Sequence, residues 1–122
     1  MKYYYEFKKL IILFQNEGYV VTNNNSYEKI IKHLAYQTKD KILINDLEYF
    51  LYHYNKLETY YKEKNEEFLE NKIIYSYSPK DENIFEESFS EIIFYIFDLF
   101  TFIGKNDFLE KLKYTFLYLF PK

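Results

Sequence analysis

Apolar residues recur at the three- and four-residue spacing of amphipathic helices in five stretches of the chain. Before four of these stretches, a side chain that can cap a helix stands three residues ahead of a glutamate that can reach back to the first turn. These pairs are Asn25 and Glu28, Asn45 and Glu48, Asn83 and Glu86, and Asp107 and Glu110. Stop signals follow three of the stretches at Gly18, Gly104 and Pro121. We therefore predict helices over residues 2–16, 26–38, 46–72, 84–103 and 107–120.

The fold class that this pattern predicts is mainly α, a compact bundle of about five helices in one domain over residues 1–122. Three short stretches between the helices, at 19–21, 41–44 and 73–77, are instead rich in residues that favour strands. We expect extended connectors there. The alternative is that they pair into a minor short-stranded sheet.

The predicted helix over 84–103 is apolar on nearly every side, which suits the middle of a bundle or a subunit interface. A homodimer is therefore one alternative for this chain. Phe97 and Phe100 lie on its most apolar side, and we expect both to be buried. Asp98 interrupts the run and is either an acid with a raised pKa or part of a narrow polar strip with Thr101 and Lys105. We favour the strip.

The predicted helix over 46–72 carries a core stripe and, opposite to it, a stripe of tyrosines followed by glutamates. Tyrosine is enriched at protein interfaces, and glutamates attract a basic partner. We predict a partner-binding surface made of Tyr49, Tyr52, Tyr60, Glu63, Glu67 and Glu70. The alternative is a solvated face in a tyrosine-rich chain.

A second cluster of acids surrounds the start of the helix over 84–103. Part of it complements the positive end of the helix dipole, and a solvated helix start is the simplest interpretation. The cluster is also a second candidate for contacting a basic surface. Its members are Asp81, Glu82, Glu86 and Glu87.

The charge balance bears on the kind of partner. All 16 basic residues are lysines, and the formal net charge is −3. Nucleic-acid-binding proteins usually present a basic stripe and use arginine for phosphate and guanine contacts, so we expect no direct binding of nucleic acid. The lysine-only usage and the abundance of Asn, Ile, Tyr and Phe indicate an AT-rich gene. An acidic chain fits a basic protein partner.

Motifs for catalysis and for metal or cofactor binding are missing from the sequence. It has no cysteine, and its two glycines cannot form a phosphate-binding loop. His33 and His53 each follow a glutamate by five residues, which is not the spacing of metal-binding helical motifs. We therefore expect no catalytic residues, no metal, no cofactor and no enzymatic activity.

The longest apolar stretch, 92–103, has 12 residues and contains Asp98, whereas spanning a bilayer takes about 20 apolar residues. The apolar run near the N-terminus, at 10–14, is too short for the core of a signal peptide. We expect no membrane association and a cytoplasmic location.

In size, acidity and composition the chain resembles the small cytoplasmic immunity proteins that bacteria encode beside polymorphic toxins, especially in contact-dependent growth inhibition systems. The runs at 3–5, 23–25 and 60–61 show this tyrosine- and asparagine-rich make-up. The resemblance implies a protein that binds one cognate toxin domain tightly and blocks its active site or substrate groove. Many such toxins are basic nucleases, which would suit the tyrosine and glutamate stripe. The alternative function is that of a structural or self-assembling helical protein.

Overall fold

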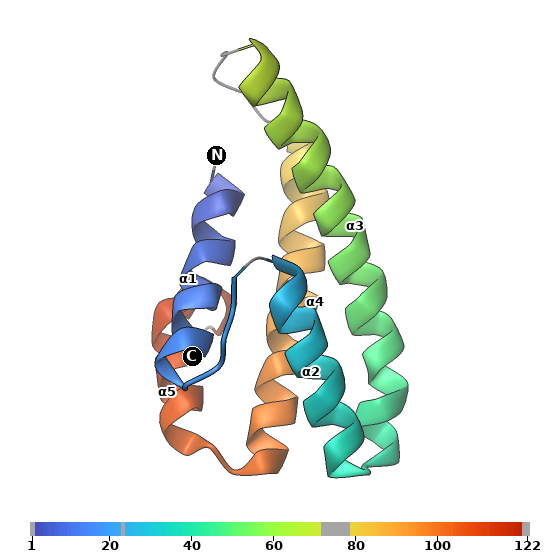
Figure 1. Ribbon diagram of the computed structural model, residues 1–122, viewed down its shortest axis with the longest axis vertical. Coiled ribbons are helices and arrows are strands. Elements are labelled where there is room, and N and C mark those ends of the chain that lie inside the picture. Colours follow the sequence, from blue (N-terminus) through green and yellow to red (C-terminus); the bar gives the residue numbers. More distant parts are fainter. Residues whose placement is uncertain (1, 23, 72–78, 121–122) are drawn as a thin grey trace.

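Five α-helices make up the computed structural model, which describes residues 2–22, 24–71 and 79–120 (Figure 1). A short 3-10 helix, η1, follows the last of them. No strand occurs in these residues, so the prediction of a mainly α bundle is confirmed. The elements are α1 (Lys2–Asn16), α2 (Asn24–Thr38), α3 (Lys41–Asn71), α4 (Pro79–Ile103), α5 (Asn106–Thr115) and η1 (Leu117–Leu119).

Helix α4 lies in the middle of the bundle. Helix α3 runs antiparallel beside it in the most extensive contact of the fold, α5 packs on its other side, and α2 packs against both α3 and α4 (Figure 1). Helix α1 contacts α2 and α5. This central position follows from the sequence. A helix that is apolar on nearly every side is most stable where other helices cover all of its sides and shield them from water.

The core is built mainly from aromatic rings. Phe14 of α1 contacts Tyr27 of α2, Phe100 of α4 and Phe108 of α5, with ring centroids 5.5 to 6.1 Å apart. The rings of Phe100 and Phe108 stack at 4.2 Å. Such pairs stabilise a fold beyond the burial of their area alone. Four helices therefore meet around Phe14, which is fully buried.

Of the two phenylalanines expected in the core, only Phe100 is fully buried. The prediction for Phe97 is wrong, because its side chain is only partly buried at the edge of the core. The ring lies beside Phe120, with centroids 5.3 Å apart, and the Nζ atom of Lys113 stands 5.1 Å from its centre.

The segment at 19–21 is an extended connector, as predicted, and no strand forms there. It is held at one end because Val21 is buried and its carbonyl accepts a hydrogen bond from Nε2 of Gln15 at 2.9 Å. The segment at 73–77 lies outside the described residues.

The prediction of a connector at 41–44 is wrong, because these residues form the first turn of α3. Lys39 adopts a left-handed conformation with φ at 59°, which turns the chain out of α2. The carboxylate of Asp40 then accepts a hydrogen bond from the backbone N–H of Leu43 at 3.0 Å, which is the geometry of an N-cap. Asn45 lies inside the helix and does not cap it.

The other helix starts also lie ahead of the predicted caps. Helix α4 begins at Pro79 rather than at 84, and proline suits the first helical position because its missing N–H would have no partner there. Helix α2 begins two residues early, and α5 one residue early with no side-chain cap. Gly18 and Gly104 adopt positive φ values just after helix ends, as the stop signals predicted. Helix α5 ends at 115 rather than 120, and η1 follows it.

The hydroxyl of Tyr27 is a polar group buried inside this aromatic core. The side chain is fully buried, and its oxygen has no hydrogen-bond partner among the described residues. Burial, and then the nearby Tyr54, raise the pKa of Tyr27 well above its usual range, so the group remains a neutral phenol. A buried polar group without a partner lowers stability, because it has lost its bonds to water.

The cap at Asp40 can be tested directly against the cap that the sequence suggested. We expect Asp40→Ala to lower the free energy of unfolding by about 1 kcal/mol, because the first turn of α3 loses its side-chain acceptor. Asn45→Ala should leave stability unchanged or raise it slightly, since alanine favours a helix interior. Urea denaturation followed by circular dichroism measures both. The opposite order of effects would show that Asn45 is the functional cap.

Removing the unpartnered hydroxyl should stabilise the fold. We expect Tyr27→Phe to raise the free energy of unfolding by about 1 kcal/mol. The matched variant Tyr95→Phe should lower it by about the same amount, because the Tyr95 hydroxyl does have a partner, the carbonyl of Leu43 at 2.8 Å. Chemical denaturation of the two variants and of the wild type measures both changes. A lower free energy of unfolding for Tyr27→Phe than for the wild type would contradict the prediction that this hydroxyl lacks a partner.

Candidate functional site

A groove of about 310 Å³ lies between the first half of α3 and the middle of α4. Each helix contributes both buried side chains, which form the floor of the groove, and exposed side chains, which form its rim. The lining residues are Leu43, Asp46, Tyr49 and Phe50 from α3, and Glu91, Phe94, Tyr95 and Asp98 from α4.

The floor of the groove is fixed by Phe50 and Tyr95, which are both buried. Their ring centroids lie 5.3 Å apart, and the Tyr95 hydroxyl donates a hydrogen bond to the carbonyl of Leu43 at 2.8 Å. Burial first, and then the carboxylate of Asp46 and the phenol of Tyr36, raise the pKa of Tyr95 to about 12. The hydroxyl therefore stays protonated and keeps donating at neutral pH. This pairing sets how the two helices sit against each other.

The rim of the groove carries exposed aromatic rings. Tyr49 is 70% exposed on the α3 side, and Phe94 is 39% exposed on the α4 side. The ring of Phe94 is held edge-on against Phe120, with centroids 5.4 Å apart. Rings that are both exposed and held in place offer contact area at a low entropic cost.

The groove is electrostatically one-sided. Three of its eight lining residues, Asp46, Glu91 and Asp98, are acidic, and none of the eight is basic. Burial first, and then the charge of Asp46, raise the pKa of Asp98 above its ordinary value. A negative potential therefore gathers in a partly enclosed site, where a cation would interact more strongly than in open water.

Asp98 and Thr101 are both exposed and lie three residues apart on α4, which agrees with a polar strip, and the pKa of Asp98 is also raised, chiefly by burial. Lys105 is directed elsewhere, with its Nζ atom 3.4 Å from the Tyr19 hydroxyl and 3.9 Å from a carboxylate oxygen of Glu17. The Thr101 hydroxyl donates to the carbonyl of Phe97 at 2.7 Å. The strip therefore includes Asp98 and Thr101, whereas the contacts of Lys105 are with Tyr19 and Glu17.

The predicted stripe on α3 is described only in part. Tyr49 and Tyr52 are exposed, but only Tyr49 lines the groove. Tyr52 packs edge-on against His53, and Nζ of Lys56 lies 5.8 Å from the centre of its ring. For the remaining members the role in partner binding stays a prediction, because their side chains lie outside the described residues. They are Tyr60, Glu63, Glu67 and Glu70.

The second predicted cluster is likewise divided. Glu86 and Glu87 are exposed on the first half of α4, and neither lines the groove. The side chains of Asp81 and Glu82 lie outside the described residues. The cluster stays a second candidate for contact with a basic surface.

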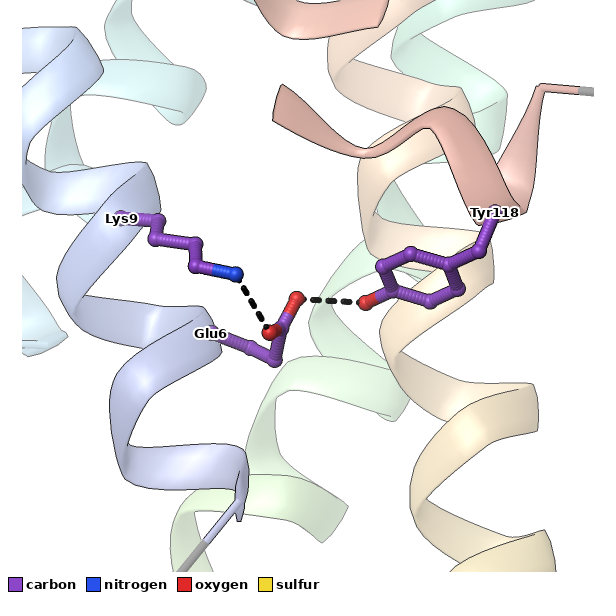
Figure 2. A network of polar contacts seen from close by, with 3 residues as sticks. All are labelled: Glu6, Lys9 and Tyr118. Atoms are coloured by element: carbon purple, nitrogen blue, oxygen red, sulfur yellow. Dashed lines mark hydrogen bonds and ion pairs between the residues drawn. The ribbon is translucent and has the colours of Figure 1, made fainter. Parts of the chain in front are cut away.

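Two polar contacts outside the groove were not predicted from the sequence. Neither of them forms a candidate functional site. Nδ1 of His53 lies 3.2 Å from the Ser88 hydroxyl, but Ser88 is fully buried and a substrate cannot reach it. Figure 2 shows the second contact, in which the buried carboxylate of Glu6 joins α1 to η1. One of its oxygens accepts from Lys9 Nζ at 3.0 Å, and the other from the Tyr118 hydroxyl at 2.5 Å. With both oxygens engaged, Glu6 is a structural link.

Among the described residues, no three His, Cys, Asp or Glu side chains are grouped so as to hold a metal ion. None of the described helices combines the length and the apolar character that crossing a bilayer requires.

The raised pKa of Asp98 predicts a pH-dependent effect on stability. Folding favours the protonated carboxyl, and this contribution is lost as pH rises through the raised pKa. At neutral pH the charged form therefore lowers stability, and Asp98→Asn should raise the urea midpoint. The gain should shrink as pH falls below about 3.9, the ordinary pKa of aspartate. The exposed acid Glu87 on the same helix is the control, and Glu87→Gln should change little at either pH. A lower midpoint in Asp98→Asn at neutral pH contradicts the prediction.

Comparison with known proteins adds no assignment. No family model matches the chain, and no curated protein or solved structure matches it. The function proposed below is therefore derived from the groove and from the composition of the chain.

Proposed function

We propose that this chain is a binding protein that holds a basic protein partner in the groove between α3 and α4, and that it thereby neutralises a cognate toxin domain. The observation that carries the proposal is the coincidence of two features in one groove. Exposed aromatic rings line its rim, and three carboxylates but no basic side chain share its lining.

Physical chemistry supports a basic ligand for such a groove. An ammonium or guanidinium group is attracted to the face of an aromatic ring, and Tyr49 and Phe94 stand on the two sides of the groove. The carboxylates of Asp46 and Asp98 repel each other, so a cation between them relieves a cost that the free protein carries. Charges around an interface also speed association with a partner of opposite sign.

The toxin-neutralising role is supported by the resemblance in size, acidity and tyrosine-rich composition to immunity proteins. A protein of that class acts by occupying the working surface of one partner, which needs a shaped binding surface and no chemistry of its own. Nuclease domains carry basic surfaces for their substrate. A groove lined with acids would compete for such a surface.

Self-assembly is the second candidate, and the exposed rings of α4 favour it. Phe94 and Phe102 are both exposed, although the other described apolar side chains of α4 are buried or partly buried. A symmetric contact through the groove would, however, bring like charges together, because the same surface meets itself in a twofold dimer. We therefore place the self-assembly proposal second.

The test begins with affinity capture of the partner from the native host and continues with the purified partner in surface plasmon resonance. Asp46→Asn and Tyr49→Ala should each weaken binding about tenfold or more, which corresponds to about 1.4 kcal/mol. Raised salt should slow association, because the carboxylates guide the encounter.

Glu110→Gln is the matched control, because it removes an exposed acid of α5 that lies outside the groove and outside both predicted partner-binding clusters. If neither groove variant changes the affinity, the binding site lies outside the groove. The Asp81–Glu87 region would then be the next candidate. Co-expression tests the neutralising role. The wild type should protect cells from the partner's toxicity, and the double groove variant should not. A homodimer that persists without any other protein would instead favour self-assembly.

A further inference from the structure

The two helices that form the groove carry the same order of side chains, which continues past the end of the groove itself. On α4, Asp98 lies four residues after Phe94 and four residues before Phe102. On α3, Asp46 lies four residues after Ile42 and three residues before Tyr49. All four flanking side chains are exposed. Each wall therefore presents an apolar, an acidic and an apolar position at steps of about one helical turn.

The two walls are also in register. Helices α3 and α4 run antiparallel, so the end of α3 that carries Ile42 lies at the same end of the bundle as the Phe102 end of α4 (Figure 1). Asp46 is near enough to Asp98 to shift its titration, and Tyr49 and Phe94 line the same groove. The groove therefore has an aromatic layer towards one end and the pair of acids towards the other. Beyond the acids, the exposed side chains of Ile42 and Phe102 follow outside the groove, and Phe102 lines a neighbouring pocket with residues of α2.

We propose that the occupant of this groove is an amphipathic α-helix of the partner, with a lysine or arginine placed between two apolar residues about one turn away on either side. This inference rests on the proposed function and specifies how the partner binds. The basic side chain enters between Asp46 and Asp98. Its apolar neighbours contact Tyr49 and Phe94 in one direction, and Ile42 and Phe102 in the other.

A helix fits better than an extended peptide, although both can repeat side chains at a similar interval. An extended peptide gains affinity from main-chain hydrogen bonds to an open sheet edge. The walls of this groove are helices, whose backbone groups are already bonded within each helix. Only side chains are left to make contacts, which is the situation in which an amphipathic helix binds in a groove.

The proposal is tested with fluorescein-labelled, alanine-based helical peptides of about 16 residues, a length at which such helices begin to persist in water. The probe carries one lysine four residues after a first leucine and three residues before a second. One control replaces that lysine with glutamine, and another moves it to the opposite face with the composition unchanged. Fluorescence anisotropy measures the affinity of each for the full chain.

We expect the probe to bind at least about tenfold more tightly than either control peptide. Asp98→Asn should abolish this preference, and Phe102→Ala should weaken all three peptides alike. Glu110→Gln, which removes an exposed acid of α5 outside the groove, should change nothing. Binding should also raise the helical signal of the probe in circular dichroism. Equal affinity of the three peptides, or no binding of any, would overturn the proposal.

Binding measurements with the purified partner distinguish a failure of the helical binding mode from a failure of the proposed function. If the purified partner depends on Asp46 and Tyr49 while no peptide binds, the groove remains the site and only the helical mode is wrong. If the affinity of the partner is unchanged by substitution of both residues, the proposed function itself fails. A dimer of this chain that the probe displaces would identify a second copy as the occupant, and would overturn the proposal of a foreign helix.

Discussion

The structure depends on the burial of α4. Its apolar residues extend almost around the helix, so several helices have to gather about it before its surface is covered. Helix α3 covers one side, α2 and α5 cover others, and α1 reaches it through rings such as Phe14 against Phe100. Coverage is incomplete along the edge of α4 that carries Glu91, Phe94 and Asp98, which are exposed beside α3. The groove is this uncovered edge, and the acids there are the positions at which α4 departs from an apolar surface.

The sequence predicts the helices well because their periodicity is a local property. It places some of their ends badly, and α3 shows why. Asn45 followed by Glu48 fits a capping pattern, but so does Asp40 ahead of Leu43 once the chain has turned at Lys39. That turn is set by where α2 and α3 pack, which a local pattern does not contain. Extending α3 upstream also places Asp46 on an interior turn of the helix, facing α4, rather than at a helix start.

The groove was predicted less well than the fold for a related reason. A helical wheel separates the buried side of α3 from the outer side and correctly marks Tyr49 as exposed. It does not say which edge of α3 meets which edge of α4, and that depends on the hydrogen bond from Tyr95 to Leu43 and on the contact of Tyr95 with Phe50. The sequence pattern therefore contains nothing that places Asp46, Glu91 and Phe94 in one site. Besides Tyr49, the local signal for the groove was Asp98, which interrupts an otherwise apolar run.

The carboxylate pair ties binding to stability. In the free protein, Asp46 and partial burial disfavour the charged form of Asp98, so the groove slightly weakens the fold that forms it. Two neighbouring acids at such a place are understandable if the protein usually meets a cation there, because the cation converts an unfavourable pair into a favourable one. A partner that binds only the folded state then stabilises it by mass action. The aromatic core around Phe14 supplies the stability that lets the free chain carry this local cost. Under the proposed function, the chain folds alone and becomes more stable once its partner is bound.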